Sequence, residues 1–405
     1  MNTGPSERSI VFVVGAVQFV NILDFMMVMP LGPDLATALG IPTSHLGYIG
    51  GAYTAAAAVA GLAGAFFLDR FDRKRALGVA MLGLAVGTAL GGFATGMWSL
   101  LCARMLAGAF GGPATALAMS IIADVIPPAR RGKAMGAVMG AFSAASVLGV
   151  PAGLELARHG GFRVPFFAVA GLGLVLLVFA MRTLPSMTAH LARRALTPET
   201  SFAKLLTRKT VLFSYAMTAT AMMAGFALIP NISAHLQQNL GYPRDDLGIL
   251  YIAGGAVSFF AMRSAGRLVD RFGSFVVGLC GAMVLIFVTW DGFYVARPLL
   301  PTVPLFMALM LASAVRNVAY NTLTSKVPAP HERARFMSLQ SAVQHGAAAL
   351  GAFASAQLLT ETADHRLEGM PQVALFSIAL AVLVPVFMRV VESRVTREAV
   401  LARRA

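Results

Sequence analysis

Twelve long apolar stretches separated by short polar breaks dominate the sequence. They fall near residues 10–31, 46–68, 76–95, 98–121, 133–155, 163–184, 209–232, 247–268, 274–292, 301–323, 336–358 and 370–390. A helix needs about 20 mostly apolar residues to cross the hydrocarbon core of a bilayer. Charged residues make up only 12% of the chain, which is too little for the water-facing surface of a soluble protein. We therefore predict an all-α membrane protein with twelve transmembrane helices.

The basic residues give a net charge of +14, and their distribution indicates an orientation in the membrane. Most of them lie at the termini and in every second break, as expected where these segments face the cytoplasm. The exceptions are Arg158, Arg163, Arg244, Arg297 and Arg366 in the other breaks, and Arg104 and Arg316 within apolar stretches. The pattern predicts two cytoplasmic termini and argues against nucleic-acid binding.

The longest break divides the chain into two halves of six predicted helices each. We expect an N-terminal bundle over 1–184, a cytoplasmic central loop over 185–208, and a C-terminal bundle with a short cytoplasmic tail over 209–405. The two bundles should be pseudo-symmetric, because two motifs of the first half recur in the second at nearly the same offset. Parallel repeats of six helices occur in proteins whose halves rock around a central site.

One of these recurring motifs lies between the second and third stretches. We compare this loop with the pattern Gly-x-Leu-x-Asp-Arg-x-Gly-Arg-Lys-x-x-Leu. The residues that match the pattern are Asp69, Arg70, Arg73, Lys74 and Leu77, and those that depart from it are Ala65, Phe67 and Asp72. The second-half copy keeps Gly266, Leu268, Asp270, Arg271 and Gly273. On these residues the chain resembles the major facilitator superfamily, and within it the twelve-helix bacterial drug and sugar efflux antiporters.

The resemblance implies that this loop latches the two halves together on the cytoplasmic side. Its residues would be Asp69, Arg70, Arg73, Lys74, Asp270 and Arg271. A carboxylate at a helix end can pair with an arginine and with a neighbouring helix N-terminus. The alternative is a basic turn that only sets the orientation in the membrane.

Arg104 lies inside the stretch 98–121, where a charge must face a cavity or a partner. It opens an Arg-x-x-x-Gly sequence that resembles another motif of the family. Asp24 lies roughly 21 Å from the inner end of its stretch and Arg104 roughly 9 Å from the outer end of its own, at 1.5 Å per residue. In a hydrocarbon core about 30 Å thick, these positions have the same depth. We predict an Asp24–Arg104 pair.

The proposed role of this pair is proton coupling. The charge of an aspartate depends on its exposure to water and on the nearness of a guanidinium, so a motion that changes either would load or release a proton. A fixed buried ion pair that only holds two helices together is the alternative.

Polar side chains within the apolar stretches predict a wet interior. Gln18, Asn21 and Asp24 recur every three residues and form one polar stripe. The candidate substrate-binding residues are Gln18, Asn21, Asp24, Tyr53, Phe226, Tyr251, Arg316, Asn317, Tyr320, Gln340, Gln344 and His345. Packing is the alternative for His345 and for the aromatic residues.

Arg316 has no obvious acidic partner within the membrane in its own half. An unpaired buried charge is not sustainable, so Arg316 reaches Asp24 or cytoplasmic acids, or else a substrate supplies the anion.

The stretch 133–155 contains Gly149, Pro151 and Gly153, which is close to the antiporter motif of the family, although Val150 separates the glycine from the proline. Glycine and proline together predict a helix that bends and packs closely.

The sequence contains no phosphate-binding glycine loop, no His-Glu-x-x-His and no Cys-x-x-Cys, so we predict neither an enzyme nor a metal or cofactor site. Together with the resemblance, these features predict a proton-coupled efflux antiporter of small amphipathic compounds such as drugs or sugars. Its partners would be a small-molecule substrate, protons and membrane lipids, and it would be a monomer in the bacterial inner membrane. An organic-anion transporter that uses Arg316 and a lysolipid flippase on the same fold remain the alternatives.

Overall fold

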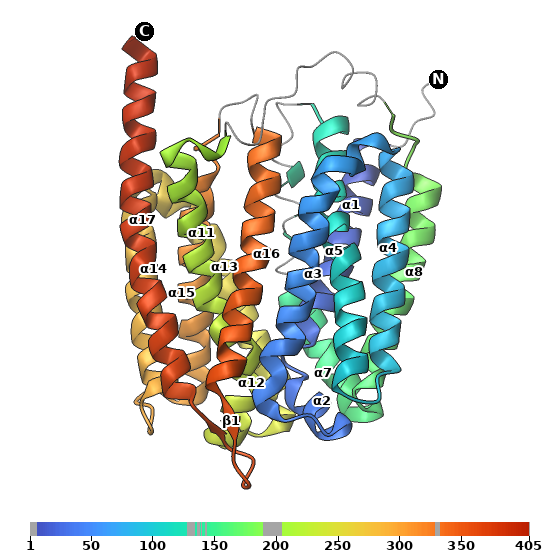
Figure 1. Ribbon diagram of the computed structural model, residues 1–405, viewed down its shortest axis with the longest axis vertical. Coiled ribbons are helices and arrows are strands. Elements are labelled where there is room, and N and C mark those ends of the chain that lie inside the picture. Colours follow the sequence, from blue (N-terminus) through green and yellow to red (C-terminus); the bar gives the residue numbers. More distant parts are fainter. Residues whose placement is uncertain are drawn as a thin grey trace. The chain divides into compact units, whose positions relative to one another are not determined.

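The computed structural model describes residues 6–127, 134–135, 138, 140–141, 144–188, 205–328 and 333–404 of the 405-residue chain. The polypeptide divides into two compact units, Met1–Glu199 and Thr200–Ala405. Each unit is a bundle of long helices that run alternately up and down (Figure 1).

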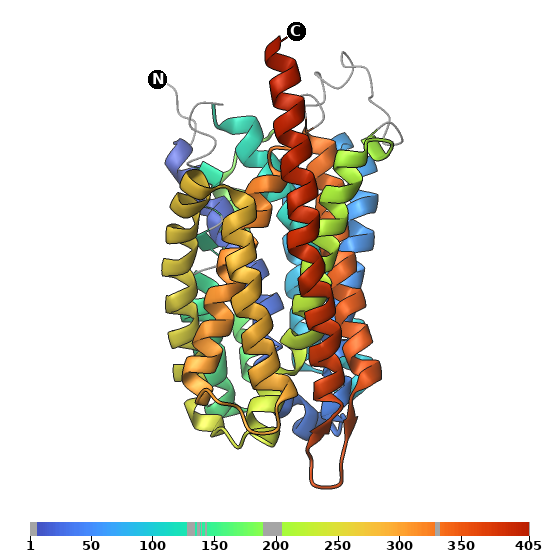
Figure 2. The ribbon, with the colours of Figure 1, turned by 90° about the vertical axis from the view of Figure 1, so that its left-hand side faces the viewer.

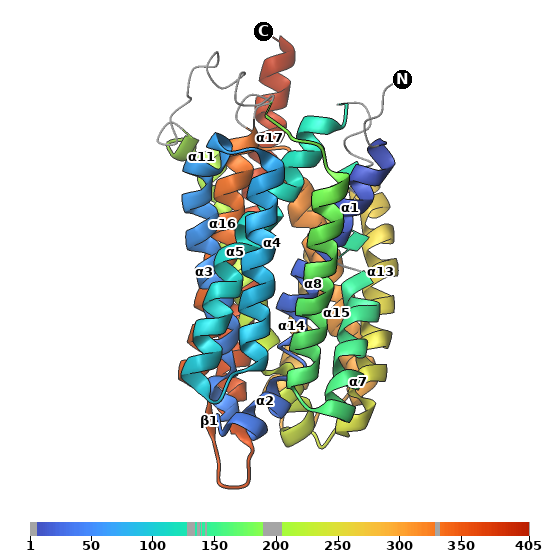
Figure 3. The ribbon, with the colours of Figure 1, turned by 90° about the vertical axis from the view of Figure 1, so that its right-hand side faces the viewer.

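The first unit contains α1 (Glu7–Met27), α2 (Gly32–Leu39), η1 (Thr43–His45), α3 (Leu46–Phe67), η2 (Leu68–Arg70), α4 (Arg73–Gly92), α5 (Met97–Val125), the π-turn η3 (Ala145–Gly149), α7 (Val150–Gly160) and α8 (Arg163–Thr183). Helix α5 packs against α1, α3 and α4, and α8 packs against α1 and α4 (Figure 3). The long helix α5 therefore contacts three of its neighbours.

The second unit contains α11 (Lys209–Leu228), η4 (Ile229–Asn231), α12 (Ile232–Ala234), η5 (His235–Asn239), η6 (Arg244–Asp246), α13 (Leu247–Phe272), α14 (Ser274–Thr289), η7 (Trp290–Tyr294), α15 (Thr302–Thr324), α16 (Arg333–Leu358), β1 (Thr360–Glu361), β2 (Leu367–Glu368) and α17 (Met370–Arg404). Strands β1 and β2 pair antiparallel in a small hairpin at the end of α17 opposite the C-terminus (Figure 2). Helix α17 extends well beyond the predicted span 370–390 and continues to Arg404 as one helix.

Ten helices of the described residues are long and apolar enough to cross a membrane. Two of the twelve predicted spans are missing from this set. The stretch 133–155 lies partly outside the described residues, and 336–358 forms most of α16, whose polar residues Gln340, Gln344 and His345 reduce its hydropathy.

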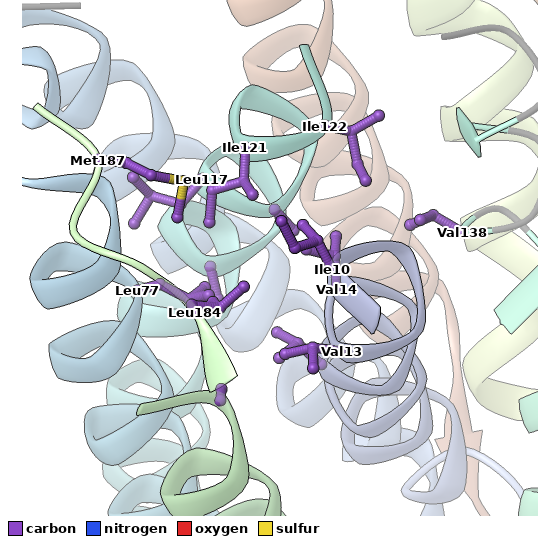
Figure 4. Close-up of a cluster of buried hydrophobic side chains, with 14 of the residues drawn as sticks. Ile10, Val13, Val14, Leu77, Leu117, Ile121, Ile122, Val138, Leu184 and Met187 are labelled. Carbon is purple, nitrogen blue, oxygen red and sulfur yellow. The ribbon is translucent and has the colours of Figure 1, made fainter. Parts of the chain in front are cut away.

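Each bundle has an apolar interior and an apolar outer surface. In the first unit, side chains from α1, α4, α5 and α8 form one buried cluster, which includes Ile10, Leu77, Leu117 and Leu184 (Figure 4). Helix α4 also exposes large apolar side chains, among them Val79. An apolar surface of this kind is stable in contact with lipid chains, whereas water would disfavour it.

The two units repeat the same order of local features. Helix α1 ends at Met27 and α11 ends at Leu228, which is an offset of 201 positions. The same offset relates the starts of α3 and α13, the starts of α4 and α14, and two left-handed glycines, Gly40 and Gly241, with φ of 63° and 68°. The repeat therefore assigns each position of helices α1, α3 and α4 an equivalent position in the second unit.

Candidate functional site

The carboxylate of Asp24 joins three helices of the first unit. Arg104 on α5 donates from Nη1 to Oδ1 and Oδ2 of Asp24 on α1, at 3.0 and 3.1 Å. Thr88 on α4 donates to Oδ1 at 2.7 Å. Asp24 and Arg104 are 0% and 1% exposed. The pairing predicted from depth is therefore present, and its role in proton coupling stays a prediction.

The guanidinium of Arg104 has a second set of contacts. It lies over the ring of Tyr53 on α3, 4.6 Å from the ring centre, where a cation is attracted by the face of the aromatic ring. Nη2 donates weakly to the backbone oxygen of Asp24 at 3.4 Å. Its buried Nε has no acceptor among the described residues. The arginine is thus held by one carboxylate, one backbone oxygen and one ring, and its Nε is left without an acceptor among the described residues.

Asn21, one turn before Asp24 on α1, extends the polar cluster toward α3 and α5. Its side-chain oxygen accepts from the Tyr53 hydroxyl at 2.9 Å. Its amide nitrogen donates to the backbone oxygen of Gly111 at 2.9 Å and to the Thr115 hydroxyl at 2.6 Å. Both side-chain groups of the buried Asn21 are therefore satisfied by protein partners, which fixes α1 against α3 and α5 at this level.

Glycines on α5 make this close approach possible. A Cβ at Gly108 would collide with the backbone oxygen of Tyr53, and a Cβ at Gly111 would collide with the Tyr53 hydroxyl. Small residues allow helices to approach closely in membranes. The Arg-x-x-x-Gly sequence of α5 thus supplies both the charge of the site and the space that α3 needs beside it.

Sequence reasoning missed Thr88 and Thr115, although each is a hydroxyl within a predicted apolar stretch. Such residues also bond their own backbone, as Thr88 does with the oxygen of Leu84 at 2.8 Å, so their position alone does not reveal a partner. Gln18, the third residue of the predicted stripe, is buried on α1, and its Oε1 has no donor among the described residues.

In the second unit, Arg316 on α15 is buried, with 2% of its surface exposed. Its Nη2 donates to the side-chain oxygen of Asn317 at 3.3 Å, and its Nε and Nη1 have no acceptor among the described residues. Among the described residues of this unit, no carboxylate pairs with Arg316.

Other predicted binding residues of the second unit have protein partners. Gln340 donates to the Thr218 hydroxyl at 2.5 Å, and Tyr251 bonds Ser233 at 3.0 Å. The Nδ1 of His345 lies 2.9 Å from the backbone oxygen of Ser341, one turn earlier on α16.

Three further candidates lie on the same helices of the second unit. They are Tyr320 on α15, Gln344 on α16 and Phe226 on α11. Tyr320 is buried beside the side chains of Gln344 and Asn321. Of the twelve candidates, Asn21, Asp24 and Tyr53 thus belong to one connected cluster in the first unit, whereas those of the second unit form a more dispersed set.

The predicted latch residues are only partly described. The side chain of Asp69 lies outside the described residues, as do 128–133 of the second recurring motif. Arg70 lies in η2, and Arg73 bonds Asp124 at the end of α5 at 3.3 Å. Asp270 lies near the end of α13, and Arg271 lies over the ring of Phe272. The latch stays a prediction.

Asp72, which stands where the loop motif has glycine, begins α4 as its N-cap. It accepts from the backbone N–H of Lys74 at 2.9 Å, from the Ser186 hydroxyl at 2.5 Å and from the N–H of Met187 at 3.0 Å. Partial burial raises the pKa of this carboxyl, but these hydrogen bonds outweigh burial and hold the pKa below its usual value. The departure from the motif thus connects the start of α4 to the segment that follows α8.

The predicted bend around Gly149, Pro151 and Gly153 coincides with a change of helix type. The π-turn η3 ends at Gly149, and α7 starts at Val150 with Pro151 in its first turn. A Cβ at Gly149 would press on Leu23 of α1. A π-turn interrupts the regular backbone ladder, and proline removes one of its donors, so this is where the helix is least constrained.

Comparison with known proteins identifies the family. The sequence model of the Major Facilitator Superfamily matches residues 14–352. The chain therefore belongs to this superfamily of transporters and is a multi-pass membrane protein.

Curated relatives are similar at low identity over about two thirds of their length. A chloramphenicol resistance protein of Streptomyces lividans is 25% identical over 260 residues, which are 64% of this chain and 66% of the relative. Multidrug resistance protein 2 of Bacillus subtilis is 26% identical over 67% of this chain and 70% of its own. A purine ribonucleoside efflux pump of Shigella sonnei is 25% identical over 69% of this chain and 68% of its own.

Solved structures share the fold. A D-xylose–proton symporter superposes with a TM-score of 0.75 over 94% of this chain and 97% of that chain, at 17% identity. A bacterial homologue of the human lysosomal transporter Spinster superposes with a TM-score of 0.73 over 97% of this chain and 98% of that chain, at 16% identity. The chain thus has the major facilitator fold.

Proposed function

We propose that this protein is a proton-coupled antiporter that exports small amphipathic compounds from the cytoplasm. It would act as a monomer in the bacterial inner membrane, with both termini in the cytoplasm and with the proton gradient as its only energy source. The observation that carries the proposal is the fully buried Asp24 carboxylate, held by Arg104 and Thr88 on two other helices.

The contacts of Asp24 link its charge to the arrangement of three helices. While Asp24 is ionised, Arg104 and Thr88 both donate to it, and the two opposite charges compensate each other in a medium of low dielectric constant. A proton on Asp24 removes the negative charge and leaves the buried guanidinium without a counterion. Because an uncompensated buried charge costs several kcal/mol, the protonated state favours an arrangement that gives Arg104 water or another acceptor.

This linkage converts proton binding into a shift between conformations. A ligand, here a proton, moves an equilibrium only as far as its affinities for the two states differ. The loss of the Asp24–Arg104 pair supplies such a difference, and the π-turn η3, which contacts α1 next to Asp24, is the local element best suited to deform. Substrate exchange in the opposite direction would complete the antiport cycle.

The direction and the substrate class rest on the similar proteins. Two of the similar curated proteins are drug resistance proteins, and another is a purine ribonucleoside efflux pump. The names thus point to efflux of a purine ribonucleoside in one case and to resistance to drugs, chloramphenicol among them, in the others. Chloramphenicol and a purine ribonucleoside such as inosine are therefore the first probes.

The test is flux in proteoliposomes with an imposed pH gradient. We expect wild-type protein to move one of these probes against its gradient when the proton gradient is present, and to stop when a protonophore collapses it. Asp24→Asn should keep downhill exchange and lose the response to pH. Glu155→Gln, an exposed carboxylate change on α7, is the matched control and should behave as the wild type does. Undiminished coupling in Asp24→Asn would show that the carboxylate has another role.

A further inference from the structure

The repeat relates Asp24 to a glycine in the second unit. An offset of 201 positions, which relates Met27 to Leu228, also relates Asp24 on α1 to Gly225 on α11. A carboxylate therefore occupies this position in the first unit, and a glycine without a side chain occupies it in the second.

Arg316 on α15 and Ile229, the next turn of the same segment, both face this glycine. A Cβ built at Gly225 would lie 3.8 Å from Nη2 of Arg316, which is ordinary van der Waals contact. Helices α11 and α15 pack against each other within the second unit. The guanidinium thus lies beside the position that corresponds to Asp24 in the first unit.

Two acids of the second unit, Asp291 in η7 and Glu392 on α17, bind backbone groups at the two ends of α14. Asp291 accepts from the backbone N–H groups of Leu299 and Leu300 at 2.7 and 3.1 Å. Glu392 accepts from the N–H groups that begin α14. Nε and Nη1 of Arg316 keep no acceptor among the described residues, although a guanidinium carries five donors and a permanent charge.

We infer that Arg316 binds a carboxylate group of the transported compound, which takes the place that Asp24 has in the first unit. A carboxylate fits because one guanidinium can bind it through two parallel hydrogen bonds. Arg316 is the only basic residue of α15, and the only one of α11, Lys209, lies 16 positions before Gly225, roughly 24 Å away along the helix. With Arg316 as the only cation that α11 and α15 carry near Gly225, a monocarboxylate matches the charge better than a phosphate dianion.

This inference rests on the proposed function, since it assigns the substrate class of that transporter. Asn317, which already accepts from Arg316, leaves an amide nitrogen available as a second donor on the same turn of α15. The expected preferred substrates are amphipathic acids, with an apolar body and one carboxylate, and such acids are added to the neutral flux probes of the proposed function.

The first test is binding by detergent-purified full-length protein to matched probe pairs. Benzoate, 1-naphthoate and 4-phenylbutyrate are each compared with the corresponding amide, by equilibrium dialysis at fixed pH. At least one acid should bind the wild type roughly tenfold or more tightly than its amide, as expected for a charge-assisted hydrogen bond. Arg316→Gln should abolish this preference for the acid. Equal binding of all acids and amides by the wild type, or an unchanged preference in Arg316→Gln, would overturn the inference.

The second test uses Gly225, and its main measurement, thermal unfolding, needs no ligand. Gly225→Asp supplies an internal carboxylate beside Arg316, Gly225→Asn is its neutral isostere, and Gly225→Ala controls for the added Cβ. We expect Gly225→Asp to have a higher Tm than Gly225→Asn, and to lose the acid preference of the wild type. In the Arg316→Gln background the order of the two Tm values should reverse. A Gly225→Asp protein that is less stable than Gly225→Asn with Arg316 present would contradict the pairing.

These experiments separate the inference from the proposed function. Both tests are made at equilibrium without a proton gradient, so they do not depend on Asp24 or on the direction of transport. If the wild type prefers acids but its transport does not respond to the proton gradient, only the antiport proposal is refuted. If its transport responds to the proton gradient but it shows no preference for acids, only the role of Arg316 is refuted.

Discussion

The Asp24–Arg104 pair allows a prediction about stability that is independent of transport. Asp24→Asn keeps the shape of the side chain and removes its charge. Arg104 then remains buried, with the ring of Tyr53 at 4.6 Å as its main electrostatic partner. Removal of one member of a buried ion pair typically costs about 3–5 kcal/mol, and the amide oxygen of the asparagine still offers Arg104 and Thr88 an acceptor. We expect a loss near the lower end, about 3 kcal/mol.

The corresponding shift in Tm follows from the size of the unit. For a cooperative unit of about 200 residues, an unfolding entropy of about 2.1 cal/mol/K per residue converts 3 kcal/mol into a decrease of roughly 7 °C. Arg104→Gln should also destabilise, because Asp24 keeps only Thr88 as a side-chain donor. The double variant carries no buried charge at this site and should be more stable than the sum of the two single effects indicates.

The assay is thermal unfolding of detergent-purified protein, followed by tryptophan or thiol-reactive fluorescence, for the wild type, the two single variants and the double variant. Glu155→Gln serves as the control for loss of an exposed carboxylate. If Asp24→Asn changes the Tm by less than about 2 °C, or if the two single effects add within error, the pair does not contribute as a compensated buried charge, and the linkage argument for protons loses its physical basis.

Three further predictions concern packing and helix ends. Asp72→Ala should lower stability by about 1 kcal/mol at neutral pH through loss of the α4 N-cap. Because the pKa of Asp72 is lowered in the folded state, thermal melts from pH 3 to 7 should show this difference above about pH 4 and its loss as the pH falls through the folded-state pKa. Gly108→Ala should separate α3 from α5 and cost about 1–3 kcal/mol in thermal melts, whereas Gly61→Ala, which meets no atom within 4 Å, should be neutral; equal effects would refute the close-approach argument. Glu392→Ala should destabilise the second unit by about 1–3 kcal/mol, because Ser274 and Phe275 at the start of α14 lose their acceptor, and an unchanged Tm would show that water replaces it.

Much of the architecture is encoded locally and was therefore predictable. The lengths of the apolar stretches, the alternation of basic breaks and the repeated motif each depend on residues close together in sequence. The depth of Asp24 and Arg104 is also a local property, since the rise of a helix fixes how far each residue lies from the end of its own stretch. Their pairing could thus be predicted although 80 positions separate them.

The tertiary structure alone decided which partners complete each site. Thr88, Thr115 and Gly111 join the cluster of the first unit because α4 and α5 are rotated so that these positions face α1. The sequence specifies which residues each helix carries, but the rotation of one helix about its axis is set by packing against its neighbours. The same reason hid the placement of Arg316 beside Gly225, because a glycine has no side chain that marks the position as a site. The sequence by itself thus determined a bundle in which Asp24 and Arg104 lie at a common depth. Only packing decided that Arg104 has a carboxylate beside it, whereas Arg316 has none among the described residues.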